Sequence, residues 1–279
     1  MDQPFAQTNL QLYNQMVKAG YQETDILLVI DAYQLAAKIF NSFYRLSGKT
    51  QLAHLIGTAS IMTELKKPSA SIAAALLHAA YAEGDFGSRS VSKELRNATS
   101  PAVQQLVFAY YRLKWPYNPK EIDRLLSSIK MLNSFDREII LLRVVNELEE
   151  YIDLAPHYHQ GRFVGDEAPT YMDARTLSTF AQVLGEPQLV KEINKQANKV
   201  RSAQISAQFR HKYALFNAQK SYRLTIGGRW RRLRRIMRRI QRLGLVETCQ
   251  AARRRLKCAF ILFMHHKNAG KKQAPPASR

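Results

Sequence analysis

The chain has 279 residues, of which 46% are hydrophobic, and a formal net charge of +20 at neutral pH. This length and apolar content suffice for one helical domain with a full core and an appended segment. The charge is concentrated at one end, since residues 222–279 hold 17 Lys and Arg and the single acid Glu247, whereas residues 1–221 hold 25 basic and 21 acidic side chains. The main domain is therefore nearly neutral, and its charge gives no reason to expect a nucleic-acid-binding surface there.

The cysteines and apolar runs exclude several other classes of protein. Cys249 and Cys258 both lie in the basic segment without a CxxC pair, so neither a zinc site nor a disulfide framework is indicated. Residues 1–16 lack the basic start and apolar run of a signal peptide. The longest apolar run of the tail, 258–264, is far shorter than the ~20 residues that cross a bilayer. We expect a cytoplasmic chain with no spanning segment.

Apolar residues recur every three or four positions through most of the chain, and no stretch alternates with period 2. The sequence therefore predicts an all-α fold. The expected helices cover residues 5–18, 23–45, 50–65, 69–82, 89–96, 100–113, 118–131, 135–154 and 171–184, with another beginning after Pro187 and a loop over 155–170. The predicted divisions are a helical domain (1–186), a connecting helix (187–221), a basic amphipathic helical tail (222–267) and a disordered end (268–279).

Residues 228–243 carry a narrow apolar stripe on a strongly basic segment. Eight Arg lie between positions 229 and 242. The apolar side chains recur three or four apart, at Trp230, Leu233, Ile236, Met237, Ile240 and Leu243. This pattern is typical of a helix that lies in a membrane interface with its Arg side chains, among them Arg231, Arg234 and Arg238, toward anionic headgroups. Each basic residue near such a surface contributes about 1 kcal/mol.

Two other interpretations of this basic segment stay open. The stripe can pack on the main domain while the Arg side chains remain in water. Alternatively, the segment can bind RNA or another polyanion, although stacking aromatic residues are scarce apart from Trp230.

Two histidines, His54 and His78, lie 24 residues apart in the apolar stretches TQLAHLIGTASIM and AAALLHAAY. Metal-dependent phosphohydrolysis needs a cation held by His nitrogens and carboxylate oxygens, because the ion must bind phosphate oxygen and acidify a water. A lone His on an apolar helix is more often a hydrogen-bonded core residue than a ligand. The pair by itself is therefore weak evidence for a metal site.

Three stretches taken together resemble the HD-domain superfamily. They are RLSGKTQLAHLIGTASIM (45–62), ALLHAAYAE (75–83) and LLRVVNELEEYIDL (141–154). In order and spacing they are most similar to the alarmone hydrolase domain of the RelA/SpoT type. Their residue pattern also resembles an uncharacterised bacterial branch of HD-like domains. The resemblance covers about residues 25–154 and implies an HD-type helical bundle.

The resemblance also implies that the metal site is lost. His54 and His78 match the two ligand histidines, but Ala79 and Asn146 stand where the family has ligand aspartates. Of the acidic pair that activates water in active relatives, only Glu83 remains. Two imidazoles and an amide make a poor site for manganese or magnesium, which prefer carboxylate oxygen. The two histidines are therefore expected to be vestigial, and no cofactor is expected.

Two further residues belong to the candidate site. Arg45 matches a residue that the family uses on the nucleotide side of the pocket, and Glu150 lies one turn beyond Asn146 on the same helix face. A rewired site that binds Mn or Mg is the alternative, formed by His54, His78, Glu83 and Glu150.

The sequence thus predicts a non-catalytic HD-like module on the inner face of the membrane. Its partner is a nucleotide, another phosphorylated ligand or a protein, and its basic tail provides a peripheral membrane contact. The ligand-binding residues are expected to be Arg45, His54, His78, Asn146 and Glu150. The alternatives are a phosphohydrolase or pyrophosphohydrolase with a rewired metal site, in which Glu83 is catalytic, and an RNA- or polyanion-binding protein.

Overall fold

The computed structural model describes residues 5–204 except 42, 46–48, 85, 87–89, 117 and 155–171. Within this part every regular element is a helix, and one isolated β-bridge joins Tyr44 to Thr50. The expectation of an all-α fold is confirmed. The elements are α1 (Asn9–Lys18), α2 (Glu23–Phe40), α3 (Gln51–Glu64), α4 (Ser69–Leu77), α5 (Ala80–Glu83), α6 (Val91–Ala98), α7 (Pro101–Arg112), α8 (Pro119–Ser128), a 3₁₀ turn (Ile129–Met131), α9 (Ser134–Ile152), α11 (Ala174–Leu184) and α12 (Pro187–Ser202).

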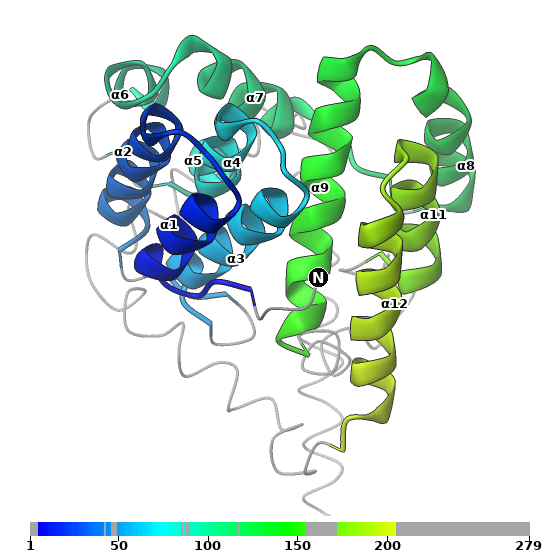
Figure 1. Cartoon of the computed structure of the whole chain (residues 1–279). Helices are drawn as coiled ribbons and strands as arrows, with labels where there is room; N and C mark the ends of the chain where they lie inside the picture. The colour runs from blue at the N-terminus through cyan, green and yellow to red at the C-terminus, as the bar shows by residue number, and fades with distance from the viewer. Residues whose placement is uncertain are drawn as a thin grey trace, which may run out of the picture.

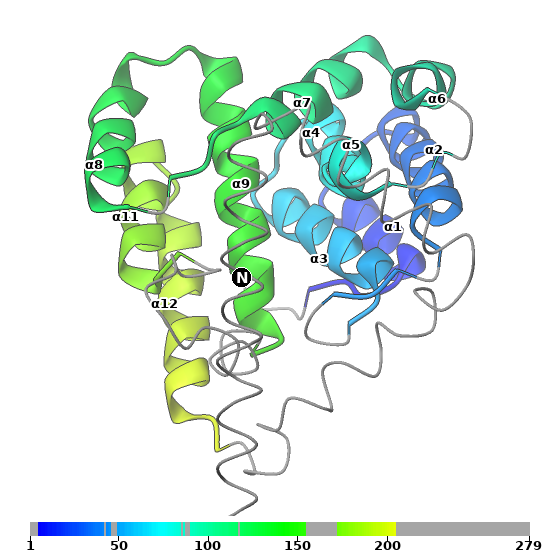
Figure 2. The same cartoon turned by 180° about the vertical axis from the view of Figure 1, so that it is seen from behind.

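The long helix α9 runs through the middle of the described structure. Helices α1–α7 lie on one side of it, and α8, α11 and α12 lie on the other (Figure 1); the view from behind shows the same division (Figure 2). Helices α3, α4 and α7 contact α9 from the first side, and α11 and α12 contact it from the second. Residues from three separate parts of the sequence therefore meet along α9.

The predicted helix over 23–45 is too long at its C-terminal end. Helix α2 ends at Phe40 because the following residues pair with the start of α3. The amide of Arg45 donates to the carbonyl of Lys49 at 2.8 Å, and the amide of Gln51 donates to the carbonyl of Phe43 at 2.8 Å. Residues 43–45 and 49–51, which we call the 43–51 hairpin, therefore lead into α3 and place two basic side chains beside it.

Two other predicted helices are interrupted. The helix expected over 69–82 breaks at His78 and Ala79, which separate α4 from α5. The helix expected over 118–131 tightens after Ser128 into a 3₁₀ turn. The backbone stays in helical conformation at both breaks, and His78 lies at the end of a helix rather than inside one.

Helices α3 and α4 form the centre of the core. They are buried on nearly all sides, as expected for helices with apolar or small residues around their whole circumference. Thr50 caps α3 by accepting a hydrogen bond from the amide of Ala53, and Asn133 caps α9 in the same way through the amide of Asp136. The first cap fixes the start of α3, and therefore the position of His54 in its first turn.

Only some of the predictions for the C-terminal part of the chain concern residues that the structure describes. Helix α12 packs on α9 and α11 through buried residues such as Leu189 and Ile193. The basic tail, the disordered end and the whole of the predicted loop at 155–170 lie outside the described residues, so these predictions and the division of the chain at 186 and 221 stay predictions. No helix of the described part is long and apolar enough to span a membrane.

Candidate functional site

The two histidines singled out in the sequence lie next to each other in the core. His54 is in the first turn of α3, His78 caps the end of α4, and both are buried. Their ring centroids are 5.5 Å apart in an edge-to-face arrangement, and His78 in turn lies 5.1 Å from the ring of Tyr110 on α7. The site is therefore built where α3, α4 and α7 face α9.

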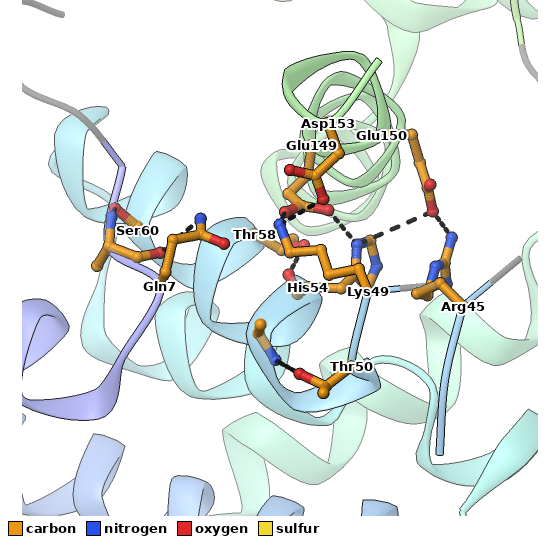
Figure 3. Close-up of polar contacts among 12 residues, drawn as sticks. Gln7, Arg45, Lys49, Thr50, His54, Thr58, Ser60, Glu149, Glu150 and Asp153 are labelled. Atoms are coloured by element: carbon orange, nitrogen blue, oxygen red, sulfur yellow. Dashed lines mark hydrogen bonds and ion pairs between the residues drawn. The ribbon is translucent and has the colours of Figure 1, made fainter. Parts of the chain in front are cut away.

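A carboxylate of α9 binds the first histidine. Glu149 Oε2 hydrogen-bonds Nδ1 of His54, and Glu149 Oε1 accepts a hydrogen bond from the ammonium of Lys49 (Figure 3). The same ammonium lies 2.8 Å from Oδ2 of Asp153. Glu149 is 1% exposed and Lys49 only 11%, so this ion pair is buried between the 43–51 hairpin and α9.

A second ion pair joins the same two elements. The guanidinium of Arg45 binds Glu150 Oε1, which also lies 3.9 Å from His54 Nδ1 (Figure 3). The Arg45 side chain is 21% exposed, whereas that of Glu150 is buried. The 43–51 hairpin is thus held against the last turns of α9 by two cations on three carboxylates.

Glycine at position 57 makes room for this arrangement. A Cβ added there would lie 2.5 Å from Oε1 of Glu149 and 3.0 Å from its Cγ. Real Cβ atoms do not approach other atoms so closely, because packed interiors leave no such overlap. Gly57 therefore lets α9 bring the Glu149 carboxylate directly onto the surface of α3.

Burial and positive charge keep both histidines neutral. The pKa of His54 lies well below its usual value, first because the ring is desolvated and then because Arg45 and Lys49 are near, while the Asn146 side chain opposes the shift. The pKa of His78 is lowered by desolvation and by His54, against the hydrogen bond to the Ala75 carbonyl. Desolvation raises the pKa of Glu149 to about 7, although Lys49 acts in the other direction.

The hydrogen bonds define which ring nitrogens remain available. His78 Nδ1 donates to the carbonyl of Ala75 at 2.7 Å, so its Nε2 carries the lone pair. When Glu149 is ionised, His54 donates from Nδ1 and its Nε2 is likewise an acceptor. In the described part of the chain, His54 Nε2 and Asn146 Oδ1 are buried without a hydrogen-bond partner. These acceptors could bind a donor or a cation.

A third ion pair lies on the α7 side of the site. Arg143 binds Glu147 one turn further along α9, and its Nη1 donates to the hydroxyl of Tyr110 at 3.1 Å. The guanidinium also lies over the ring of Trp115, 5.6 Å from its centroid. Every acid of α9 that approaches the histidines is therefore matched by a basic side chain.

The residues present do not fit a manganese or magnesium ion. The unpartnered acceptors supply an imidazole nitrogen and an amide oxygen, and Ala79 offers no side-chain donor where a carboxylate is needed. Arg45 and Arg143 lower the pKa of both histidines, so these two cations disfavour additional positive charge at the rings. No three His, Cys, Asp or Glu side chains in the described residues are arranged to hold a metal ion.

The other predicted residues are placed as follows. Asn146 and Glu150 lie on α9 beside His54, and Arg45 joins them through Glu150. Glu83 ends α5 and is partly exposed, and among the described contacts its side chain makes no hydrogen bond or ion pair with either histidine. The predicted membrane-contacting residues of 230–243 lie outside the described residues.

Two residues that fill the site, Glu149 and Lys49, are not among the site residues predicted from the sequence. Glu149 is three positions after Asn146, and residues three apart share a helix face as residues four apart do. Spacing therefore pointed to Glu149 as well as to Glu150. Lys49 gave a weaker signal, since a basic residue before a helix is usually a solvated side chain, and only the hairpin turns it toward α9.

A comparison with protein families agrees with this architecture. The family sequence model described as HD domain matches residues 32–160, from within α2 to beyond the end of α9. This match supports an HD-domain superfamily protein and so bears out that part of the resemblance. It does not separate the RelA/SpoT-type branch from others, so that finer assignment stays a prediction. No curated protein matches the chain.

Proposed function

We propose that the chain is a non-hydrolytic HD-like module that binds a phosphorylated ligand or a protein partner at an anionic membrane surface. The observation that carries the proposal is the state of the carboxylates around His54. Glu149 and Glu150 are each bound by a cation of the 43–51 hairpin. They are therefore engaged in ion pairs instead of being free to replace the two missing aspartates.

A nucleotide or other phosphorylated ligand is supported by Arg45. It is the more exposed of the two hairpin cations, and guanidinium groups bind phosphate oxygens in a bidentate manner. Such a ligand would have to exchange with Glu150 for the guanidinium. A protein partner is supported by a different feature. Arg45, Lys49 and Arg143 are each already paired with an acid of α9, so binding a phosphate would require an ion pair to break.

The membrane part of the proposal is supported by sequence. Residues 222–279 carry 17 basic side chains against one acid, and the apolar stripe of 230–243 suits an interfacial helix. Full-length protein is expected to sediment with anionic liposomes and to stay in the supernatant with neutral ones. A variant with Arg231, Arg234 and Arg238 changed to Glu should stay in the supernatant with both, and equal partition of the two proteins would contradict this role.

A rewired phosphohydrolase is the second candidate, and one observation favours it. His54 Nε2 and Asn146 Oδ1 are buried acceptors without partners in the described part. Buried polar atoms without partners are rare because they cost free energy. A cation that accepts both imidazole nitrogen and amide oxygen as ligands could satisfy both atoms.

Metal content separates the two candidates. Purified full-length protein is analysed by plasma mass spectrometry before and after dialysis against manganese, together with His78→Ala. We expect much less than one metal ion per chain in every sample. Near-stoichiometric metal that disappears in His78→Ala would overturn the non-hydrolytic assignment, and a screen of phosphate esters would then identify the substrate.

A further inference from the structure

Exposed apolar side chains are concentrated on α1 and α2. Among the described residues the strongly exposed large apolar side chains are Leu10, Val17, Leu27, Phe108, Met131 and Phe135. Leu10, Val17 and Leu27, which are 66%, 61% and 51% exposed, lie on these two helices, which contact each other on the side of α9 away from α11 and α12 (Figure 1). We call the surface formed by these three residues the α1–α2 face.

The helical periodicity places these residues on the outside. Leu10 and Val17 are two turns apart on α1 and share one face, whereas the buried residues of this helix, Leu12 and Met16, face the core. Nothing in the described part of the chain covers the outer side. Because α1 and α2 contact each other, their exposed apolar side chains make this side of the domain a candidate binding surface.

The charge around Leu27 is negative. Glu23 and Asp31 lie one turn before and one turn after it, and both are exposed. Between Lys18 and Lys38 the chain contains three acids and no basic residue. The α1–α2 face therefore has an acidic edge on its α2 side, whereas α1 contributes no acid and ends with Lys18 beside Val17.

The remaining exposed apolar residues lack a purely acidic edge, because Phe108 and Met131 have basic neighbours and Phe135 is followed by both Asp136 and Arg137. Phe108 is followed one turn later by Arg112, and Met131 directly follows Lys130. A basic amphipathic segment would be repelled there and attracted at the α1–α2 face. Charge complementarity thus selects one of the exposed apolar surfaces in the described residues.

The chain itself contains a matching segment. Residues 228–243 combine apolar residues spaced three or four apart with eight Arg and no acid. The 23 residues between position 204 and this segment can extend over about 75 Å. A domain of this size has a radius of gyration of about 16 Å, so the segment can reach any side of it.

We propose that residues 228–243 dock on the α1–α2 face of the same chain and that this contact competes with the membrane for the apolar stripe. The inference rests on the proposed membrane role and adds regulation to it. The stripe has one apolar side, so it lies either on Leu10, Val17 and Leu27 or in the interface of a bilayer. Anionic lipid therefore has to displace the domain before the chain binds.

Hydrogen exchange of the full-length protein without lipid tests the docking. The wild type is compared with Leu233→Glu/Ile240→Glu, which breaks the stripe without touching the described helices. Amides of α1 and α2 should exchange at least threefold faster in the variant, and those of α7 should not change. Unchanged exchange in α1 and α2 would overturn the proposal, as would protection that depends on protein concentration, because a second chain would then cover the face.

Liposome sedimentation tests the competition. Leu10→Ser/Leu27→Ser should raise the bound fraction on anionic liposomes about twofold, because the stripe is released, and Met131→Ser serves as the matched control that changes nothing. An unchanged bound fraction in the double variant would overturn the competition. If no protein sediments, the membrane role itself fails, whereas the exchange experiment still decides whether the segment docks.

Discussion

His54 and Glu149 are joined by a hydrogen bond between the imidazole Nδ1 and a carboxylate oxygen inside the contact between α3 and α9. The other oxygen of the same carboxylate binds the ammonium of Lys49. One buried acid therefore connects the candidate site to the 43–51 hairpin. Any change that moves the Glu149 carboxylate away from Lys49 also alters its hydrogen bond to His54.

Restoring the two missing acids should create a metal site. The double variant Ala79→Asp/Asn146→Asp places two carboxylates beside the histidines, and divalent manganese prefers carboxylate oxygen. We expect its manganese affinity, measured by titration calorimetry, to rise at least about tenfold, or about 1.4 kcal/mol. Ala102→Asp adds an acid at an exposed position in the first turn of α7 and is the control. A double variant that folds but binds manganese no better than wild type would show that these positions are not the ligand positions.

Removing the Lys49 ammonium should leave buried acid without its cation. Breaking one side of a buried ion pair costs about 3–5 kcal/mol, and Lys49→Met should lose about that much free energy of unfolding near pH 8. Lys195→Met removes an ammonium that is 60% exposed, while its buried partner Glu192 keeps the hydrogen bond from Gln196, so this variant should cost less than about 1 kcal/mol. Denaturant titration gives both values, and Lys49→Met/Glu149→Gln should recover part of the loss. Equal losses in the two single variants would show that the Lys49 pair is not a buried one.

Glu149 and the two histidines should change the free energy of unfolding in opposite directions as the pH rises. Its pKa is raised to about 7 in the folded state from an ordinary value of 4.5, so folding retains its proton, and its contribution falls as the pH rises through this window. The pKa values of His54 and His78 are lowered, so the unfolded chain takes up their protons, and their contribution rises with pH up to about 6.5.

Glu149→Gln removes the opposing group and leaves both histidines in place. Between about pH 5 and 6.5 the free energy of unfolding should therefore rise more steeply in the variant than in wild type, by up to about 1.4 kcal/mol per pH unit. Urea titrations at several pH values measure this slope, and the exposed Glu121→Gln provides the matched control. Parallel slopes for wild type and Glu149→Gln would mean that Glu149 titrates alike in the folded and unfolded chain.

The sequence could predict the helices better than the contacts between them. Helical periodicity extends through Tyr44 and Arg45 without a break, so the end of α2 at Phe40 was missed, although Ser47 and Gly48 are turn-forming residues. What ends the helix is the pairing of residues 43–45 with 49–51, which is a property of the folded chain.

The same limit applies to the candidate site. The resemblance brought His54, His78 and Asn146 together, and the structure places these three side chains in one buried region. It could not show that Arg45 and Lys49 neutralise the acids of α9, because an ion pair between residues 100 positions apart, such as Lys49 and Glu149, leaves no spacing signal. The acids themselves were visible, but which of them face the histidine depends on the rotation of α9 against α3.

Gly57→Ala should lower the free energy of unfolding because the added Cβ would clash with the side chain of Glu149. Alanine favours a helix over glycine by up to about 1 kcal/mol, so Gly57→Ala would stabilise an exposed part of α3. Here the added Cβ would meet Glu149 Oε1 at 2.5 Å. Forcing α9 or the carboxylate away costs about 1–3 kcal/mol, as overpacking of a core does, and we expect a net loss in the free energy of unfolding.

A double-mutant cycle separates this contact from any general effect of the substitution. In a Glu149→Ala background the carboxylate is gone, and Gly57→Ala should then be neutral or stabilising, whereas in wild type it destabilises. The interaction energy of the cycle is obtained from urea titrations of the four proteins. Because the Glu149 contact holds both His54 and Lys49, Gly57→Ala alone should also reproduce part of the steeper pH slope of Glu149→Gln. A cycle that is additive would show that the clash at Gly57 lies with another part of α9.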